Sequence, residues 1–319
     1  MSETKKTDKI VIVGGKTLTG EVSISGAKNA ALGILPAAIL ADSPMTIDNL
    51  PDIQDVNIYL TMLSKLGAKV ERSGDHVVID PKGISYDNIE LIVEETTKLR
   101  ASYYILGAFL SKYRRARQPR PGGCPIGSRP INLHIKAFEA LGATVTVQSG
   151  YIDAEAKELK GADIYFDNVS VGATINAMLA AVMAEGTTTL TNAAKEPHVV
   201  DIANCLNLMG ARISGAGTDT IRIKGVPSLH GASYSVVPDQ IQAGTYMIAS
   251  AATCGNVLIK NIIPEHLDSL TAKLREMGNE VIEYDDSIRV IGHRPLKPVN
   301  IKTMPHPGFP RTFSSPWEY

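Results

Sequence analysis

A cysteine in a loop is the residue of this chain with the clearest chemical potential. Glycine and proline surround Cys124 on both sides, and this composition excludes both a helix and a paired strand. The next stretch, 131–142, has apolar residues at helical spacing and begins just after Arg129. An arginine and a helix N-terminus both lower the pKa of a nearby thiol, so the pattern predicts an exposed, reactive Cys124. The alternative is a loop cysteine without a chemical role.

Cations lie where three of the helices are expected to begin. Lys28 follows Ser25, which is expected to cap its helix; Lys98 and Arg100 open a second helix, and Arg129 opens a third. Helix N-termini carry partial positive charge, so cations are unfavourable there unless an anion is bound. Any one of these residues alone is explained as an ordinary surface side chain. Together they predict a site for a phosphorylated or carboxylated ligand beside the cysteine.

Composition limits the classes of function. The 319 residues suffice for about two domains, and a net charge of -1 argues against coating nucleic acid or a membrane. Three widely spaced cysteines give neither a metal pattern nor a disulfide framework, and Cys205 and Cys254 are expected to be buried and inert. No apolar run approaches the length of a membrane helix, and residues 1–6 are polar. We therefore expect a cytoplasmic protein without a membrane span.

The chain is built from a repeated unit. A helix followed by two short β-type runs recurs four times, and the helices close at glycines about 70 residues apart, Gly67, Gly142, Gly210 and Gly278. A second, alanine-rich helix, usually followed by a strand, recurs between them, at 27–40, 101–110, 173–184 and 243–252. Each unit is thus predicted as helix, strand, helix, strand, strand. The pattern favours an α/β class with helices packed inside and sheet outside, and a solenoid is the alternative.

Two places break the repeat. After Leu110 a strand is due, but residues 111–120 contain four arginines, and no strand is predicted there. Those arginines are interpreted as a solvated loop face, with a phosphate or nucleic-acid patch as the alternative. A further unit begins at residue 299, and the chain ends before its helix.

With these residues identified, the chain resembles the UDP-N-acetylglucosamine enolpyruvyl transferase family. The resemblance covers about residues 9–310, and its motifs lie at 25–30, 98–102, 121–130, 169–174, 196–197 and 305–310. It implies an inside-out α/β barrel fold of repeated βαβαββ units, three in each of two domains, with the ligands in the cleft between them. It also implies that residues 21–236 form a complete three-unit domain and that residues 1–20 plus 237–319 form a second, truncated one.

The resemblance further implies an activity and roles for particular residues. Family members transfer the enolpyruvyl (carboxyvinyl) group of phosphoenolpyruvate to the 3-hydroxyl of UDP-N-acetylglucosamine, the first committed step of peptidoglycan synthesis, without a cofactor or metal. Cys124 adds to phosphoenolpyruvate, donates a proton to its methylene carbon and is alkylated by fosfomycin. The substrates are implied to contact Lys28, Asn29, Arg100, Arg129, Pro130, Ile131, Asn132, Leu133, Val169, Ser170, Val171 and Gly172. Asn132 replaces the acidic residue common at its position.

The C-terminal segment departs from the family pattern. The family motif ending at Pro310 continues with threonine and an aspartate, the usual candidate for the base, whereas this chain has Arg311 and Thr312. Residues 311–319 are interpreted as frameshifted sequence, and turnover is expected to be impaired. Two alternatives remain: an inactive UDP-sugar-binding remnant, and 3-phosphoshikimate 1-carboxyvinyltransferase, which the cysteine loop and residues 169–172 disfavour.

Overall fold

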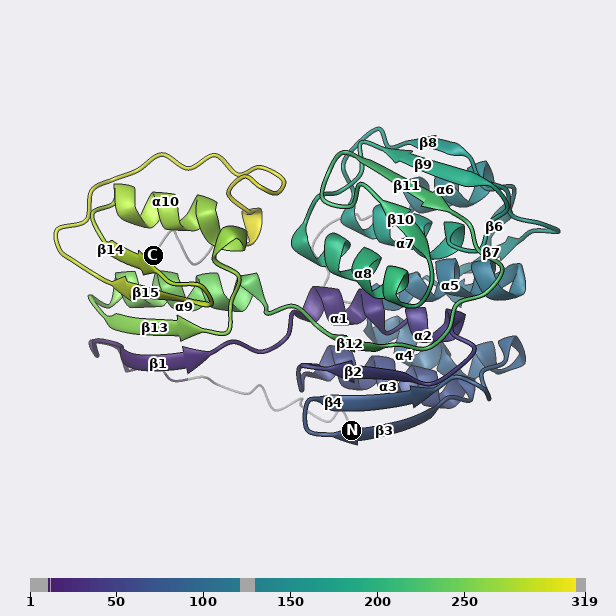
Figure 1. The fold of residues 1–319 in the computed structure, drawn as a ribbon, viewed down its shortest axis with the longest axis horizontal. Coiled ribbons are helices and arrows are strands. Elements are labelled where there is room, and N and C mark those ends of the chain that lie inside the picture. Colours follow the sequence, from purple (N-terminus) through teal and green to yellow (C-terminus); the bar gives the residue numbers. More distant parts are fainter. Residues whose placement is uncertain (1–10, 12, 121–129, 314–319) are drawn as a thin grey trace, which may run out of the picture.

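The apolar side chains of the protein form two separate cores. The computed structural model describes residue 11, residues 13–120 and residues 130–313. The larger core is built from residues between Ala27 and Val236, and the smaller one from Ile24 together with residues of the stretch 243–313. Figure 1 shows the two corresponding groups of elements beside each other, joined by two segments of chain.

Helices make up the inner part of the larger group. Its α-helices are α1 (Lys28–Ile34), α2 (Ala37–Leu40), α3 (Gln54–Leu66), α4 (Val93–Lys98), α5 (Tyr104–Tyr113), α6 (Asn132–Ala140), α7 (Val171–Ala181) and α8 (Pro197–Leu208). The α-helices of the smaller group are α9 (Gln240–Ala252) and α10 (Asp268–Glu276). The 3-10 helices are η1 (Tyr86–Ile92), η2 (Arg100–Tyr103), η3 (Pro264–Leu267) and η4 (Arg311–Phe313).

Four small sheets repeat one strand pattern. The first two sheets have the strand orders β12 (Ser233–Ser235), β2 (Met45–Asp48), β4 (His76–Asp80), β3 (Lys69–Ser73) and β5 (Arg115–Pro119), β7 (Tyr151–Glu155), β6 (Thr144–Gln148). The third sheet has the order β10 (Arg212–Ser214), β11 (Thr220–Lys224), β9 (Thr187–Thr191), β8 (Asp163–Tyr165). The fourth, in the smaller group, has the order β1 (Thr19–Ser23), β13 (Asn256–Lys260), β15 (Ser287–Ile291), β14 (Glu280–Glu283). The four repeat glycines close the preceding helices in the left-handed conformation, with φ between 97° and 114°. The predicted repeat is confirmed.

The helices pack against one another inside, and the sheets lie outside (Figure 1). Within the larger group α5 contacts α7, α1 contacts α8 and α2 contacts α5, which a linear solenoid of repeats would not allow. Small side chains make this close packing possible: a Cβ on Gly107 of α5 would lie 2.3 Å from Asn176 Oδ1 of α7. The prediction of an inside-out α/β arrangement is therefore confirmed, and the solenoid alternative is wrong.

The two groups exchange a strand with each other. Strand β1 leads into α1 of the larger group but pairs in parallel with β13 of the smaller one. Strand β12 leads into α9 of the smaller group but pairs in parallel with β2 of the larger one. The chain thus crosses between the groups twice, and the two crossing segments adjoin, because Gly26 and Pro238 form an antiparallel bridge.

The second repeat unit has the strand that the sequence seemed to lack. Strand β5 pairs antiparallel with β7 along its whole length, so the prediction of no strand after Leu110 is wrong. Ala116 and Gln118 are buried on one face, whereas Arg117 faces outward between Glu90 and Asp153. The alternation of a buried-face strand was therefore present in the sequence, but the arginines on its outer face obscured it.

Two expected helix starts also differ from the structure. Lys98 ends α4 instead of opening a helix, and Arg100 opens the 3-10 helix η2 that precedes α5. The N-cap of α1 is Ala27, which makes no side-chain capping hydrogen bond, so Ser25 is not the cap. The Ser25 hydroxyl instead donates to Gln242 Oε1 of α9 at 3.1 Å.

Neither a membrane-spanning helix nor a metal cluster is found in the described part of the chain. None of its helices is both long enough and apolar enough to cross a bilayer. Over the same residues, no group of three or more histidine, cysteine, aspartate or glutamate side chains is arranged to hold a metal ion.

Candidate active site

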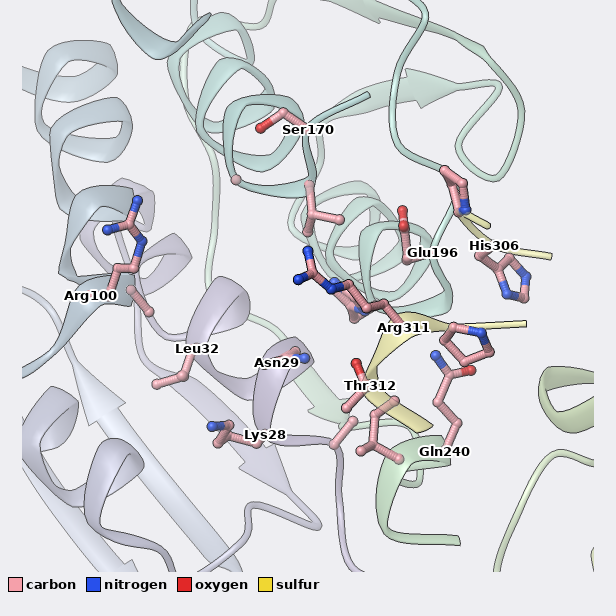
Figure 2. Close-up of a pocket in the computed structure, with 18 of the residues that line it drawn as sticks. Lys28, Asn29, Leu32, Arg100, Ser170, Glu196, Gln240, His306, Arg311 and Thr312 are labelled. Atoms are coloured by element: carbon pink, nitrogen blue, oxygen red, sulfur yellow. The ribbon is translucent and has the colours of Figure 1, made fainter. Parts of the chain in front are cut away.

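A cavity of about 1130 Å³ lies between the two groups of elements. Its lining comes from the start of α1, the η2 segment and the start of α7 on one side, and from the start of α9 and residues 303–312 on the other. Figure 2 shows Lys28 and Asn29 on one helix, with Arg100 and Ser170 on two other segments around this space and Arg311 approaching from the opposite side. Because several helices start at its wall, the cavity is suited to an anionic ligand.

Lys28 and Asn29 form the first turn of α1, and both line the cavity. The Lys28 ammonium pairs with Asp55 at 3.3 Å, and its side chain is 48% exposed, so the ammonium can still reach a ligand. The Lys28 amide donates to Asp239 Oδ2 at 3.1 Å, and Asp239 Oδ1 caps α9 by accepting from Ile241 and Gln242. Asp239 thereby connects the N-termini of two helices that belong to different groups.

A fixed hydrogen-bond network orients His134 beside Arg100. Asn176 Oδ1 must face the Gly107 amide, which donates to it at 2.9 Å. The Asn176 NH₂ group therefore faces Nδ1 of His134 at 3.0 Å, and also donates to the Tyr103 carbonyl. Nδ1 accepts, so a neutral His134 carries its proton on Nε2.

Burial keeps His134 neutral at physiological pH. Burial, and to a smaller extent the nearby Arg100 charge, lower the pKa of His134 to about 4. Arg100 also lies over the Tyr103 ring, with its guanidinium carbon 5.5 Å from the ring centroid. Nε2 lies on the side of Gly172, where an added Cβ would be 3.3 Å away. The imidazole is thus a neutral hydrogen-bond donor at the cavity wall.

The start of α7 supplies a second helix N-terminus. Ser170 is its N-cap, and the Ser170 hydroxyl accepts from the Ala173 amide at 3.3 Å. Val169, Ser170, Val171 and Gly172 all line the cavity, as Pro130 does opposite them. The segment therefore presents backbone donors and small side chains to a ligand, an arrangement suited to phosphate oxygens.

The structure brings most, but not all, of the predicted site residues together. Lys28, Asn29, Arg100, Pro130 and the four residues Val169, Ser170, Val171 and Gly172 line the one cavity. Ile131 and Leu133 instead pack against the larger core, and Asn132 is exposed at the start of α6. Cys124 and Arg129 lie outside the described residues. The contact predicted for Ile131, Asn132 and Leu133 is thus not seen in the cavity lining.

Sequence reasoning missed the wall that faces these residues. It contains three histidines, with Glu196, Gln240 and Arg311 between them; the histidines are His198, His266 and His306. Burial lowers the pKa of His198 to about 4, and it also lowers the pKa values of His266 and His306. The Glu196 carboxylate acts in the opposite direction on His306. The sequence offered a signal for part of this wall, because residues 196–197 and 305–310 are among the motifs that carried the resemblance.

The two other cysteines differ from each other. Cys205 is buried in α8, and burial raises the pKa of its thiol far above its ordinary value. Cys254 is exposed just after α9, so the expectation that it is buried is wrong. Its backbone φ of 51° marks the tight turn between α9 and β13, and this turn carries the thiol out of the helix packing.

Comparison with known proteins identifies the relatives of this chain. The family model described as EPSP synthase (3-phosphoshikimate 1-carboxyvinyltransferase) matches residues 12–314. UDP-N-acetylglucosamine 1-carboxyvinyltransferase 3 of Caldanaerobacter subterraneus subsp. tengcongensis is 58% identical over 97% of this chain and 74% of its own length. UDP-N-acetylglucosamine 1-carboxyvinyltransferase 2 of Clostridium acetobutylicum is 56% identical over the same shares.

Solved structures show the same fold. The enolpyruvyl transferase NikO from Streptomyces tendae superposes with a TM-score of 0.78 at 26% identity, over 89% of this chain and 68% of that one. EPSP synthase from Acinetobacter baumannii gives a TM-score of 0.68 at 18% identity, over 91% of this chain and 68% of that one, which shows a shared fold alone. From the sequence matches and the shared fold together, the chain belongs to the UDP-N-acetylglucosamine 1-carboxyvinyltransferase family of enolpyruvyl transferases.

Proposed function

We propose that this protein transfers the enolpyruvyl group of phosphoenolpyruvate to the 3-hydroxyl of UDP-N-acetylglucosamine, the first committed step of peptidoglycan synthesis. The observation that carries the proposal is identity of 51–58% over 97% of the chain to relatives named for this reaction. The cavity supports it, because cations and three helix N-termini surround one space large enough for two anionic substrates. Both substrates are cytoplasmic metabolites, so we place the reaction in the cytoplasm.

The proposed roles follow from the charge that the reaction develops. Protonation of C3 of phosphoenolpyruvate builds positive charge at C2, and the sugar hydroxyl attacks that carbon. We assign the proton donor to Cys124, and the binding of phosphate and carboxylate to Lys28, Asn29, Arg100 and Arg129. The hydroxyl proton leaves to a base, and phosphate then departs as C3 loses a proton. No metal or cofactor takes part in this scheme.

The sugar nucleotide is proposed to occupy the other end of the cavity. Residues 169–172 present the N-terminus of α7 there, which favours the diphosphate. Arg129, Pro130, Ile131, Asn132 and Leu133 are proposed to lie along the uridine. Pro130 lines the cavity, whereas Ile131 caps α6 and Asn132 and Leu133 lie in its first turn, outside the cavity lining.

We propose a division into two domains at the two chain crossings. Residues 21–236 would form the first domain and residues 1–20 plus 237–319 the second. Two separate cores support this division, one within residues 27–236 and the other built largely from residues 243–313. In this arrangement the substrates bind between the domains, so domain closure can exclude water from the reaction.

Two measurements test the proposed function. The first is phosphate release from phosphoenolpyruvate with and without UDP-N-acetylglucosamine, and the second is calorimetric measurement of UDP-N-acetylglucosamine binding. Release that depends on the sugar nucleotide is the expected result. Binding without release would indicate an inactive UDP-sugar-binding protein. Release that depends on shikimate 3-phosphate would instead favour 3-phosphoshikimate 1-carboxyvinyltransferase, the activity named by the matching family model.

A further inference from the structure

The two crossing segments are hydrogen-bonded to each other directly behind the cavity. The Ala27 amide donates to the Val237 carbonyl at 2.7 Å, and the Asp239 amide donates to the Ser25 carbonyl at 2.9 Å. Ala27 supplies no side-chain cap for α1, so the first amides of this helix depend on the returning segment. The position of Lys28 and Asn29 in the cavity is therefore set by the position of residues 237–239.

A buried carboxylate holds the returning segment from the opposite side. Asp201 of α8 is 1% exposed. Its Oδ1 accepts from the Tyr234 hydroxyl at 2.5 Å, and its Oδ2 accepts from the Val237 amide at 3.3 Å. Within the described residues no lysine or arginine forms an ion pair with Asp201. The carboxylate is thus fixed to the segment by a phenol and a backbone amide.

Burying the Asp201 carboxylate is unfavourable, so Asp201 is not explained as a residue that merely fills the core. Burial raises the pKa of Asp201 to about 6, while the hydrogen bonds from Tyr234 and Val237 act in the opposite direction. A buried carboxylate without a cation destabilises a fold relative to an apolar side chain of similar size. One of its hydrogen bonds nevertheless comes from the amide of Val237, the residue whose carbonyl accepts from the Ala27 amide.

We propose that Asp201 is a positioning residue: through Val237 it holds the N-terminus of α1, and with it Lys28 and Asn29, in the geometry that binds phosphoenolpyruvate. Asp201 does not line the cavity. The residues proposed for the sugar nucleotide lie around the starts of α6 and α7, and none of them belongs to the crossing segments. The inference rests on the proposed function for its ligand, but the structural link from Asp201 to α1 stands independently.

Asp201→Asn tests the proposal, because it keeps the size of the side chain but places an NH₂ group against one of the two donors. We expect amide hydrogen exchange at Ala27 and Lys28 to accelerate about 5- to 10-fold, the effect of weakening one hydrogen bond. We also expect kcat/KM for phosphoenolpyruvate to fall about 10- to 100-fold, as for a displaced binding group. Binding of UDP-N-acetylglucosamine should change much less.

Asn207→Ala is the matched control. Asn207 lies on the same helix, and its side chain also makes two hydrogen bonds to backbone, donating to the Ile213 carbonyl and accepting from the Ile213 amide. Neither group belongs to the crossing segments. Its loss should lower thermal stability without accelerating exchange at Ala27 and Lys28. If Asp201→Asn and Asn207→Ala give the same pattern, Asp201 is merely structural and the proposal is overturned.

Tyr234→Phe provides a second variant in case Asp201→Asn does not fold. It removes the hydroxyl that orients Oδ1 but leaves the Val237 contact, so the same pattern is expected with an exchange effect of about 2- to 3-fold. Unchanged exchange at Ala27 and Lys28 in this variant would overturn the proposal. If the unaltered protein releases no phosphate, the proposed function fails, and the exchange measurements still decide the role of Asp201.

Discussion

Individual ionisable residues give this protein an expected dependence of stability on pH. Burial lowers the pKa values of His134 and His198 to about 4, from an ordinary 6.5. As pH falls below 6.5, the two histidines are protonated in the unfolded chain before they are protonated in the folded one. The free energy of unfolding that the neutral histidines contribute is therefore complete above pH 6.5 and is lost toward pH 4. Asp201 acts oppositely, since its folded pKa is raised to about 6 from 3.8, and its protonation favours the folded state as pH falls below 6.

The first prediction follows from adding these effects. From pH 7.5 to pH 5.0 these three groups together should lower the free energy of unfolding by roughly 3 kcal/mol, with about 2 kcal/mol lost for each of His134 and His198 and about 1 kcal/mol regained from Asp201. His134→Gln should reduce this difference by about 2 kcal/mol, because glutamine does not titrate. Urea unfolding at the two pH values measures both quantities. An equal difference in the variant and the unaltered protein would contradict the assignment.

The second prediction concerns the thiols. Fosfomycin should modify Cys124 and leave Cys205 unmodified, because Cys205 is buried and its pKa is raised well above the ordinary value. Cys254 is exposed, so a general thiol reagent should label it, but it is not part of the cavity lining and should not react with fosfomycin. Peptide mass mapping distinguishes the three, and Cys254→Ser is the control. Fosfomycin on Cys205 or Cys254 would disprove the assignment of Cys124.

The third prediction separates site cations from surface cations. Arg100→Ala and Arg129→Ala should each weaken substrate binding by about 1.5 to 3 kcal/mol, the range for a charge-assisted hydrogen bond. Arg115→Ala should have almost no effect on binding, because Arg115 pairs with Asp87 and stacks over Tyr86 outside the cavity. Calorimetry with phosphoenolpyruvate and UDP-N-acetylglucosamine measures these losses. Equal losses for Arg100 and Arg115 would indicate that the basic strand β5 holds the anion.

At the scale of secondary-structure elements, the crossing of the two chain segments requires a residue without a side chain. A Cβ on Gly26 would lie 1.8 Å from the Asn49 carbonyl oxygen. Asn49 in turn holds the returning segment, because its side-chain NH₂ group donates to the Val236 carbonyl at 2.8 Å. Backbone, rather than a flexible side chain, therefore occupies the space, and a methyl group there must displace the crossing.

The fourth prediction is that Gly26→Ala destabilises the protein by at least the 1 to 3 kcal/mol typical of overpacking. The displaced segment carries Lys28, so affinity for phosphoenolpyruvate should fall as well. Gly14→Ala is the control, because a Cβ at Gly14 meets nothing within 4 Å. Thermal unfolding and calorimetry provide the two measurements. A Gly26→Ala protein as stable as Gly14→Ala would show that the crossing is not tightly packed.

Elements that follow a simple period were predictable from the sequence, and elements that mix signals were not. The strands around residues 70, 77–79 and 221–223 and the glycine-closed helices appear as expected. Strand β5 was missed because its outward arginines pair with carboxylates that are distant in sequence, Arg115 with Asp87 and Arg117 with Glu90 and Asp153. The helix expected near Arg100 is divided into α4, η2 and α5, because Leu99 is extended, with φ of −125° and ψ of 115°.

The candidate site shows the same limit. Motifs carried by one continuous segment, such as Val169–Gly172 before α7, were found in the sequence, and they line the cavity. The histidine wall was missed because His198, His266 and His306 come from three separate segments that meet through folding. The pairing of β1 with β13 and of β12 with β2, across the two groups, was not predicted. Local pattern carries no information about pairing over such a sequence distance.

At the scale of the whole molecule, the cavity is a joint product of the two groups of elements. The start of α9 and residues 303–312 come from the smaller group, and α1, η2 and α7 come from the larger one. A ligand that contacts both walls adds interactions between groups that are otherwise joined mainly through the crossing segments. Ligand binding should therefore stabilise the two groups together.

The fifth prediction is that UDP-N-acetylglucosamine and phosphoenolpyruvate together slow amide hydrogen exchange at the starts of both α7 and α9. At a ligand concentration of about 100 Kd the folded state gains about 2.7 kcal/mol, which should also raise the unfolding temperature by several degrees. Lys28→Ala provides the control, because it removes a cation from the larger group's wall and should lower the protection in both helices in parallel. Protection of α7 with none at α9 would mean that the ligands contact the larger group alone. In that case the wall formed by His266, His306 and Arg311 would have no part in binding, and the site would have to be assigned to the first domain alone.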